Sequence, residues 1–173
     1  MVARKKLQIA PFDDIKVIGI NTTLLDYKMA WNINQALCLD LTRYADIPIK
    51  GVDFSFYYHS AGEQCNVYDL VALTRQEKSW MNLSPHVDYI LIIRNEIAED
   101  RLQNFVKGIR GIKGVIHAFL VDLTKDFDPF LEMIELHEIS IQESLSVRRN
   151  LDELRRDIME KRKSGQTVRP ATL

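Results

Sequence analysis

The chain has 173 residues, of which 46% are hydrophobic and 27% charged, and its formal net charge is −1. This composition is ordinary for a globular protein and argues against the disordered and membrane classes. The length is that of one domain, which can bury a core without metals or disulfides. The most apolar run, residues 89–93, is far shorter than the roughly 20 residues that cross a bilayer. We therefore expect a soluble, cytoplasmic protein.

Cysteine content supports the same compartment. Cys38 and Cys65 are the only cysteines, too few for a disulfide scaffold and consistent with a reducing environment. Each is predicted to be a small, buried hydrophobic residue.

The first elements predicted along the chain are an arm, a strand and a helix. Residues 1–12 predict an N-terminal arm, and β-branched residues over 15–20 predict a strand. The segment Asn21-Thr22-Thr23 supplies N-cap candidates for a helix from about Leu24 to Leu41. Its predicted inward face comprises Tyr27, Ala30, Trp31, Asn34, Leu37, Cys38 and Leu41. A buried Asn34 amide would need hydrogen-bond partners.

Three strands are predicted next. Residues 52–59 alternate between apolar and polar, as in a strand with one buried face. A turn at 60–63 and the run 64–74 predict the second arm of a hairpin. Residues 87–93 are nearly all apolar, which predicts a central strand covered on both faces.

The last part of the chain is predicted to be mostly helical. Asn95 is expected to cap a helix over 96–107, with Gly108, Gly111 and Gly114 ending it before a strand at 115–121. The element order β-α-β-β-β-α-β predicts an α+β two-layer sandwich, a ferredoxin-like variant with both helices on one sheet face. A three-layer α/β arrangement is the alternative. The predicted organisation is an arm (1–12), an α+β domain (13–127), a C-terminal helical region (128–164) and a flexible tail (165–173).

Motifs that carry chemistry are scarce in this sequence. It contains neither a Walker-type phosphate loop nor a Gly-x-Gly-x-x-Gly turn. The histidines are scattered, and His59 with Cys65, which flank the hairpin turn, gives only two of the four ligands of a structural zinc site. A nucleophilic Cys65 with His59 or His86 as its base is the remaining hypothesis. We predict no catalytic residue, no metal site and no cofactor.

The C-terminal helical region carries two signals. Val147, Leu151, Leu154 and Ile158 recur every three or four residues, which predicts a short coiled-coil seam that binds a protein partner or a second copy. Residues 148–173 have a net charge of +4, which leaves −5 on the rest. A basic region of this kind is the basis of an RNA-binding alternative. Its candidate contacts are Arg148, Arg149, Arg155, Arg156, Lys161, Arg162 and Lys163.

Three segments resemble a known family. They are Ile18-Gly19-Ile20 leading to Leu25-Asp26-Tyr27-Lys28, then Trp31 to Leu37, and Val87-Asp88-Tyr89 followed by Ile-Leu-Ile-Ile. Over about residues 10–122 the chain resembles the bacterial IPExxxVDY family, although Met81-Asn82-Leu83 stands where the family name has Ile-Pro-Glu. The resemblance implies a small cytosolic bacterial protein and supplies no catalytic residues.

The function that the sequence favours is that of an interaction or accessory protein without enzymatic activity, which uses the C-terminal helix to bind a protein partner or itself. The alternatives are a nucleic-acid- or ribosome-associated factor that uses the basic region, and a small-molecule-binding regulatory domain. No membrane partner is expected.

Overall fold

The computed structural model describes residues 14–60, 62, 65–75, 77–81, 83–124 and 127–163. For residues 157 and 161–163 it describes the backbone alone. The predicted arm and tail lie outside this range. The chain divides into two compact units, Met1–Pro129 and Phe130–Leu173. Within the described part, no helix is both long and apolar enough to cross a membrane.

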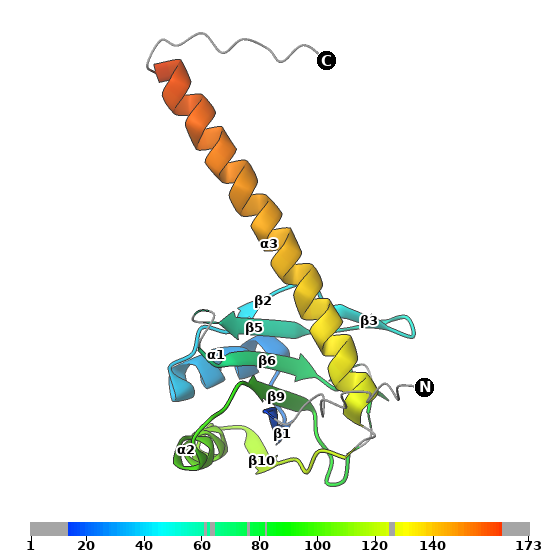
Figure 1. Ribbon diagram of the computed structural model, residues 1–173. Coiled ribbons are helices and arrows are strands. Elements are labelled where there is room, and N and C mark those ends of the chain that lie inside the picture. Colours follow the sequence, from blue (N-terminus) through cyan, green and yellow to red (C-terminus); the bar gives the residue numbers. More distant parts are fainter. Residues whose placement is uncertain are drawn as a thin grey trace, which may run out of the picture. The chain divides into compact units, whose positions relative to one another are not determined.

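The centre of the first unit is an antiparallel sheet. Its described strands are ordered β10-β1-β9-β6-β5-β2, as Figure 1 shows. Their bounds are Lys16–Thr22 (β1), Thr42–Arg43 (β2), Phe56–Ser60 (β5), Val67–Ala72 (β6), Tyr89–Arg94 (β9) and Val115–Leu120 (β10). The predicted hairpin is confirmed, since β5 pairs with β6 from Phe56↔Val71 to Ser60↔Val67. The central position of β9 is also confirmed, because it lies between β1 and β6 and all of Ile90–Ile93 are 0% exposed.

Two helices pack on one face of this sheet, so the α+β fold is confirmed. They are α1 (Asp26–Leu37) and α2 (Glu99–Arg110). Met29 and Ile33 of α1 and Phe105 of α2 join one core cluster with inward residues of the sheet, including Ile18 and Leu91. The passage β9-α2-β10 is a split β-α-β unit, because β1 lies antiparallel between β9 and β10. The passage through α1 also joins two parallel strands, because β2 runs in the same direction as β1 and lies at the far edge of the sheet, with β9, β6 and β5 between them.

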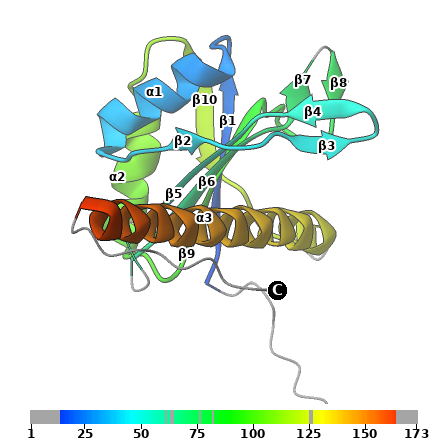
Figure 2. The ribbon, with the colours of Figure 1, turned by 90° about the horizontal axis from the view of Figure 1, so that it is seen from above.

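Two small hairpins extend from the sheet. Strand β3 (Ile47–Ile49) pairs with β4 (Val52–Phe54), and β7 (Thr74–Arg75) pairs with β8 (Lys78–Ser79). Lys50 and Gly51 both have positive φ, the geometry of a tight hairpin turn. The two hairpins lie side by side, with β4 against β7 (Figure 2). The strand predicted over residues 52–59 is thus divided at Ser55 between β4 and β5.

The predicted inward face of the first helix is correct at Ala30 and Leu41, which are buried, but wrong at its two aromatic residues. Tyr27 and Trp31 are 56% and 62% exposed, whereas Met29, Ala30 and Ile33 are buried. Two apolar stripes overlap on this helix, an aromatic one through Tyr27 and Trp31 and an aliphatic one through Met29 and Ile33. The aliphatic stripe packs on the sheet. The helix also ends at Cys38 in a left-handed conformation (φ 54°), so later residues do not continue its register. The prediction for Asn34 is confirmed, because its side chain accepts from the Leu41 amide at 2.8 Å and donates to the Leu41 carbonyl at 3.2 Å.

The predicted N-caps are wrong as well. Helix α1 follows Leu25 and helix α2 follows Ala98, and neither residue caps its helix through a side chain in the described structure. The Thr22 hydroxyl instead accepts from the Leu24 amide at 3.1 Å. Asn95 has positive φ and donates its side-chain amide to the Cys65 carbonyl at 2.7 Å. These hydrogen bonds stabilise the connections that precede the two helices. Gly108 lies inside α2 rather than beyond its end.

The second unit is built on helix α3 (Asp128–Lys163), which has 36 residues. At 1.5 Å per residue it is about 54 Å long. The long C-terminal helix expected from the sequence is therefore present.

Candidate functional site

The predicted seam residues share one stripe of helix α3. Val147, Leu151, Leu154 and Ile158 are 56%, 50%, 56% and 36% exposed. At 3.6 residues per turn their side chains leave the helix in nearly the same direction. Helix α3 therefore presents four aliphatic side chains together to solvent.

Two further exposed apolar residues of α3 fall on the same stripe, one or more turns earlier. These are Met133 and Leu136, which lie 14 and 11 residues before Val147 and so close to a whole number of helical turns. The positions between them and Val147 on this stripe are polar, as at Ser140 and Ser144. Met159 is exposed but points away from the stripe. The continuous apolar seam is therefore limited to 147–158.

The basic residues of α3 surround this seam without forming a uniform positive face. Arg148, Arg149, Arg155 and Arg156 are exposed. Asp152 lies between them on the helix surface and is 3.7 Å from the Arg155 guanidinium. The side chains of residues 161–163 lie outside the description. The RNA-binding interpretation stays a prediction.

A cleft of about 410 Å³ lies at one end of the sheet in the first unit. Its walls come from the β1–α1 connection, the residue that precedes β5, the end of β6, strand β7 and the start of β9. Charged and hydroxyl groups in the lining include Asp26, Thr74, Arg75, Asp88 and Tyr89. The cleft has the size of a small-molecule site, although polar groups make up much of its lining.

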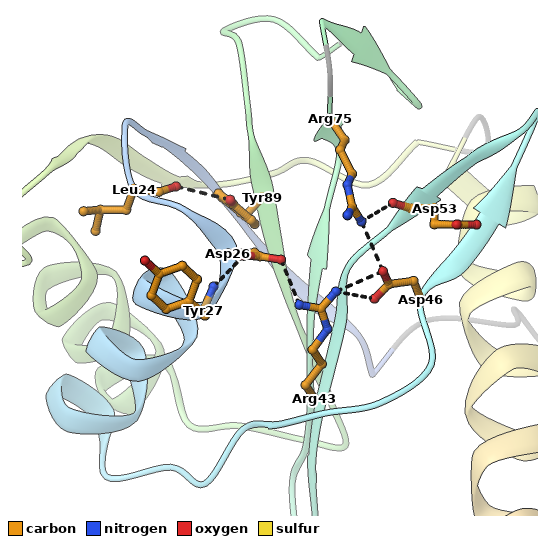
Figure 3. A network of polar contacts seen from close by, with 8 residues as sticks. All are labelled: Leu24, Asp26, Tyr27, Arg43, Asp46, Asp53, Arg75 and Tyr89. Carbon is orange, nitrogen blue, oxygen red and sulfur yellow. Dashed lines mark hydrogen bonds and ion pairs between the residues drawn. The ribbon is translucent and has the colours of Figure 1, made fainter.

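Alternating charges connect the two sides of this cleft (Figure 3). The Arg43 guanidinium is 3.3 Å from the Asp26 carboxylate and donates to both carboxylate oxygens of Asp46 at 2.9 Å. Arg75 donates to Asp46 at 3.1 Å and also to the Asp53 carbonyl. The Asp46 carboxylate raises the pKa of Arg43. This chain of ion pairs links helix α1 to β2 and to both hairpins.

Tyr89 is one of the buried residues that line the cleft. Its hydroxyl donates to the Leu24 carbonyl at 3.2 Å. Burial raises the pKa of Tyr89 to about 12, and the carboxylates of Asp26 and Asp88 act in the same direction. Burial also raises the pKa of Tyr57, with Asp26 adding to the effect and Arg43 opposing it. The Tyr89 phenol is therefore a protonated donor at neutral pH.

Asp88 connects the start of β9 to the last residue of β1. Its carboxylate accepts from the Thr22 amide at 2.9 Å and lies 3.1 Å from the His86 ring. The segments Leu25–Lys28 and Val87–Tyr89, which carry the sequence resemblance, thus meet at this cleft. Leu25, Asp26, Asp88 and Tyr89 of these segments all line it. Among the described residues, no group of three or more His, Cys, Asp or Glu side chains is placed to hold a metal ion.

The two cysteines lie near the opposite end of the sheet. Cys38 and Cys65 are both exposed, so the prediction that they are buried is wrong. The left-handed conformation of Cys38 takes it off the buried stripe of α1, and Cys65 lies in the connection between β5 and β6. Both line a cleft of about 370 Å³ together with His59 and Arg101.

His59 and Cys65 are therefore brought to one cleft, as their positions in the hairpin suggested. The His59 ring stacks on Tyr68 with centroids 5.9 Å apart. His86 is not an alternative base for Cys65, because the two lie near opposite ends of β9, about 20 Å apart for a strand of this length.

The cleft network is the part of the site that sequence reasoning missed. Arg43 and Asp46 are three positions apart, but the other two ion pairs join residues 17 and 29 positions apart, and no short motif indicates those two. The only available signal was that Asp26 and Tyr89 belong to two of the three segments that carry the resemblance.

Comparison with known proteins adds no relative. No protein-family model matches the chain, and neither does any curated protein. The resemblance to the IPExxxVDY family stays a prediction.

Proposed function

We propose that this protein is an interaction protein without enzymatic activity, which associates with other protein chains through the 147–158 seam of helix α3. One observation carries the proposal: four aliphatic side chains lie on one stripe and are each at least 36% exposed. Scattered exposed aliphatic residues are normal on protein surfaces, but an aligned row of them marks an interaction site.

Free energy favours a partner for this seam. Burying one Leu, Ile or Val side chain contributes about 1.5–3 kcal/mol. A helix segment that packs on nothing depends on its intrinsic propensity alone, which is marginal in water. Association would therefore stabilise both the apolar side chains and the helix that carries them.

Site-specific photo-crosslinking tests the proposal directly. A photoreactive phenylalanine analogue replaces Leu154 in one variant and Met159 in the other, in cells that produce the full chain. Met159 is the matched control, because it is apolar, 67% exposed and five residues away but off the seam. We expect covalent protein adducts from position 154 and few or none from position 159. Equal adduct yields from the two positions would refute the docking role.

A second candidate function, small-molecule binding, is favoured by the cleft of about 410 Å³ beside Tyr89. A ligand that binds the native state raises the unfolding temperature. A metabolite panel should then shift the melting temperature of the wild-type chain but not of an Arg75→Ala variant. The absence of any shift across the panel would remove this candidate.

A further inference from the structure

We infer that the partner of the 147–158 seam is a second copy of this chain, bound in parallel and in register as a short two-stranded coiled coil. This inference rests on the proposed function and names the occupant of the same surface.

The heptad positions follow from the spacing of the seam. Steps of four, three and four place Val147 and Leu154 at d, and Leu151 and Ile158 at a. The positions that flank the seam are then e and g. Arg148 and Arg155 stand at e, and Glu143 and Asn150 stand at g. In the sequence the next g and e positions are Asp157 and Arg162.

These flanking residues are complementary in one orientation only. In a parallel pair, a g residue faces the e residue of the following heptad of the partner chain. Glu143 would then meet the partner's Arg148, and Asn150 the partner's Arg155. In an antiparallel pair, e faces e and g faces g, so arginine would lie opposite arginine. Repulsion between like charges disfavours that arrangement.

Self-pairing is favoured over pairing with a different helix because each chain carries both members of every complementary pair. A two-fold interface uses the same patch on both copies and repeats each such contact twice. The seam is bounded by Ser144 on one side and by Lys161 on the other. Four apolar layers make a short coiled coil, so the dimer should dissociate on dilution.

Disulfide trapping between full-length chains tests the orientation. The native cysteines are exposed and are first replaced, as Cys38→Ser and Cys65→Ser. Val147→Cys or Ile158→Cys is then added and oxidised glutathione is supplied. In the parallel dimer each variant should form a disulfide-linked dimer with itself, and a mixture should yield no 147–158 species. A 147–158 species as the main product would establish the antiparallel orientation and overturn the inference.

Charge exchange gives an independent readout by light scattering over a concentration series. Arg148→Glu should weaken the parallel dimer by about two- to ten-fold, and the additional Glu143→Arg change should restore it. In an antiparallel dimer Arg148→Glu alone would instead tighten association. Arg149→Glu, one residue away at an outward f position, is the matched control and should leave the dissociation constant unchanged.

The oligomeric state separates this inference from the proposed function. The wild-type mass should rise from 20.1 kDa toward twice that value with concentration, and Leu154→Glu should remain monomeric. A strictly monomeric wild-type chain that still gives photo-adducts from position 154 would overturn the second copy as partner and leave the docking role in place. A dimer that Leu154→Glu does not weaken would overturn the inference, because another surface would then form the interface.

Discussion

Leu91 in strand β9 and Leu154 in helix α3 are the same residue type in opposite settings. Leu91 is 0% exposed in the core of the first unit, whereas Leu154 is 56% exposed. Polar groups differ in the same way: Asn34 makes two hydrogen bonds to the Leu41 backbone, while the ion pair described at Asp152 is long and exposed. Leu91 and Asn34 thus find their partners within the first unit. The seam of α3 leaves its apolar side chains available for another chain.

The largest expected effect is a loss of stability in the core of the first unit. Leu91→Ala should lower the free energy of unfolding by about 3–5 kcal/mol, because it removes buried methyl groups and leaves a cavity. Leu154→Ala should change it by less than about 0.5 kcal/mol at concentrations where the chain is monomeric. Urea denaturation measures both. A similar loss in the two variants would mean that the seam is already packed within one chain.

The buried Tyr89 phenol should make the stability of the first unit depend on pH. Its pKa of about 12 lies above the ordinary value of 10.0, so between pH 10 and 12 the unfolded chain loses a proton that the folded chain keeps. Stability from this group is fully present below pH 10 and is lost as the pH rises through 12, by up to about 3 kcal/mol. Tyr89→Phe should reduce the alkaline fall in denaturation experiments. An unchanged fall would contradict the burial of this phenol.

The next prediction concerns the two hydrogen bonds between the Asn34 side chain and the Leu41 backbone. Asn34→Ala should cost about 1–2 kcal/mol, because the Leu41 amide and carbonyl each lose a partner in a partly buried setting. Asn150→Ala on the exposed surface of α3 is the matched control and, at concentrations where the chain is monomeric, should be neutral or slightly stabilising, since alanine is the better helix former. Thermal unfolding of the two variants, followed by circular dichroism, gives the contrast. Equal melting temperatures would argue against the Asn34 bonds.

The smallest expected effect concerns the ion pairs at the first cleft. Asp46→Ala removes the carboxylate shared by Arg43 and Arg75 and should cost about 0.5–1 kcal/mol at low salt, since these groups are partly exposed. Asp152→Ala in α3 should cost less. Raising the ionic strength should shrink the Asp46 effect, because salt screens exposed charges. A cost that does not depend on salt would mean that packing, not charge, holds this junction.

Sequence reasoning succeeded where a local pattern has one physical solution. The unbroken apolar run of β9 fits only a buried central strand, and an amide in the position of Asn34 requires partners. It failed where two solutions compete, as on α1, where the stripe through Trp31 and the stripe through Ile33 overlap. Cys38 was misplaced because nothing in the sequence signals a left-handed helix end at a cysteine. The ion pairs Arg43–Asp26 and Arg75–Asp46 could not be predicted, since tertiary structure alone brings these residues together.

The position of β1 has a consequence for the growing polypeptide. Its neighbours are β9 and β10, so Ile20 pairs with Tyr89 and Ile18 with Leu120. At about 5–20 residues per second, β9 leaves the ribosome several seconds after β1. Throughout that interval the apolar strand β1 has no partner strand. Strand pairs between residues far apart in the sequence also form slowly. The nascent chain therefore exposes an unpaired, apolar strand until late in translation. We expect chaperone binding or misassembly to begin at β1.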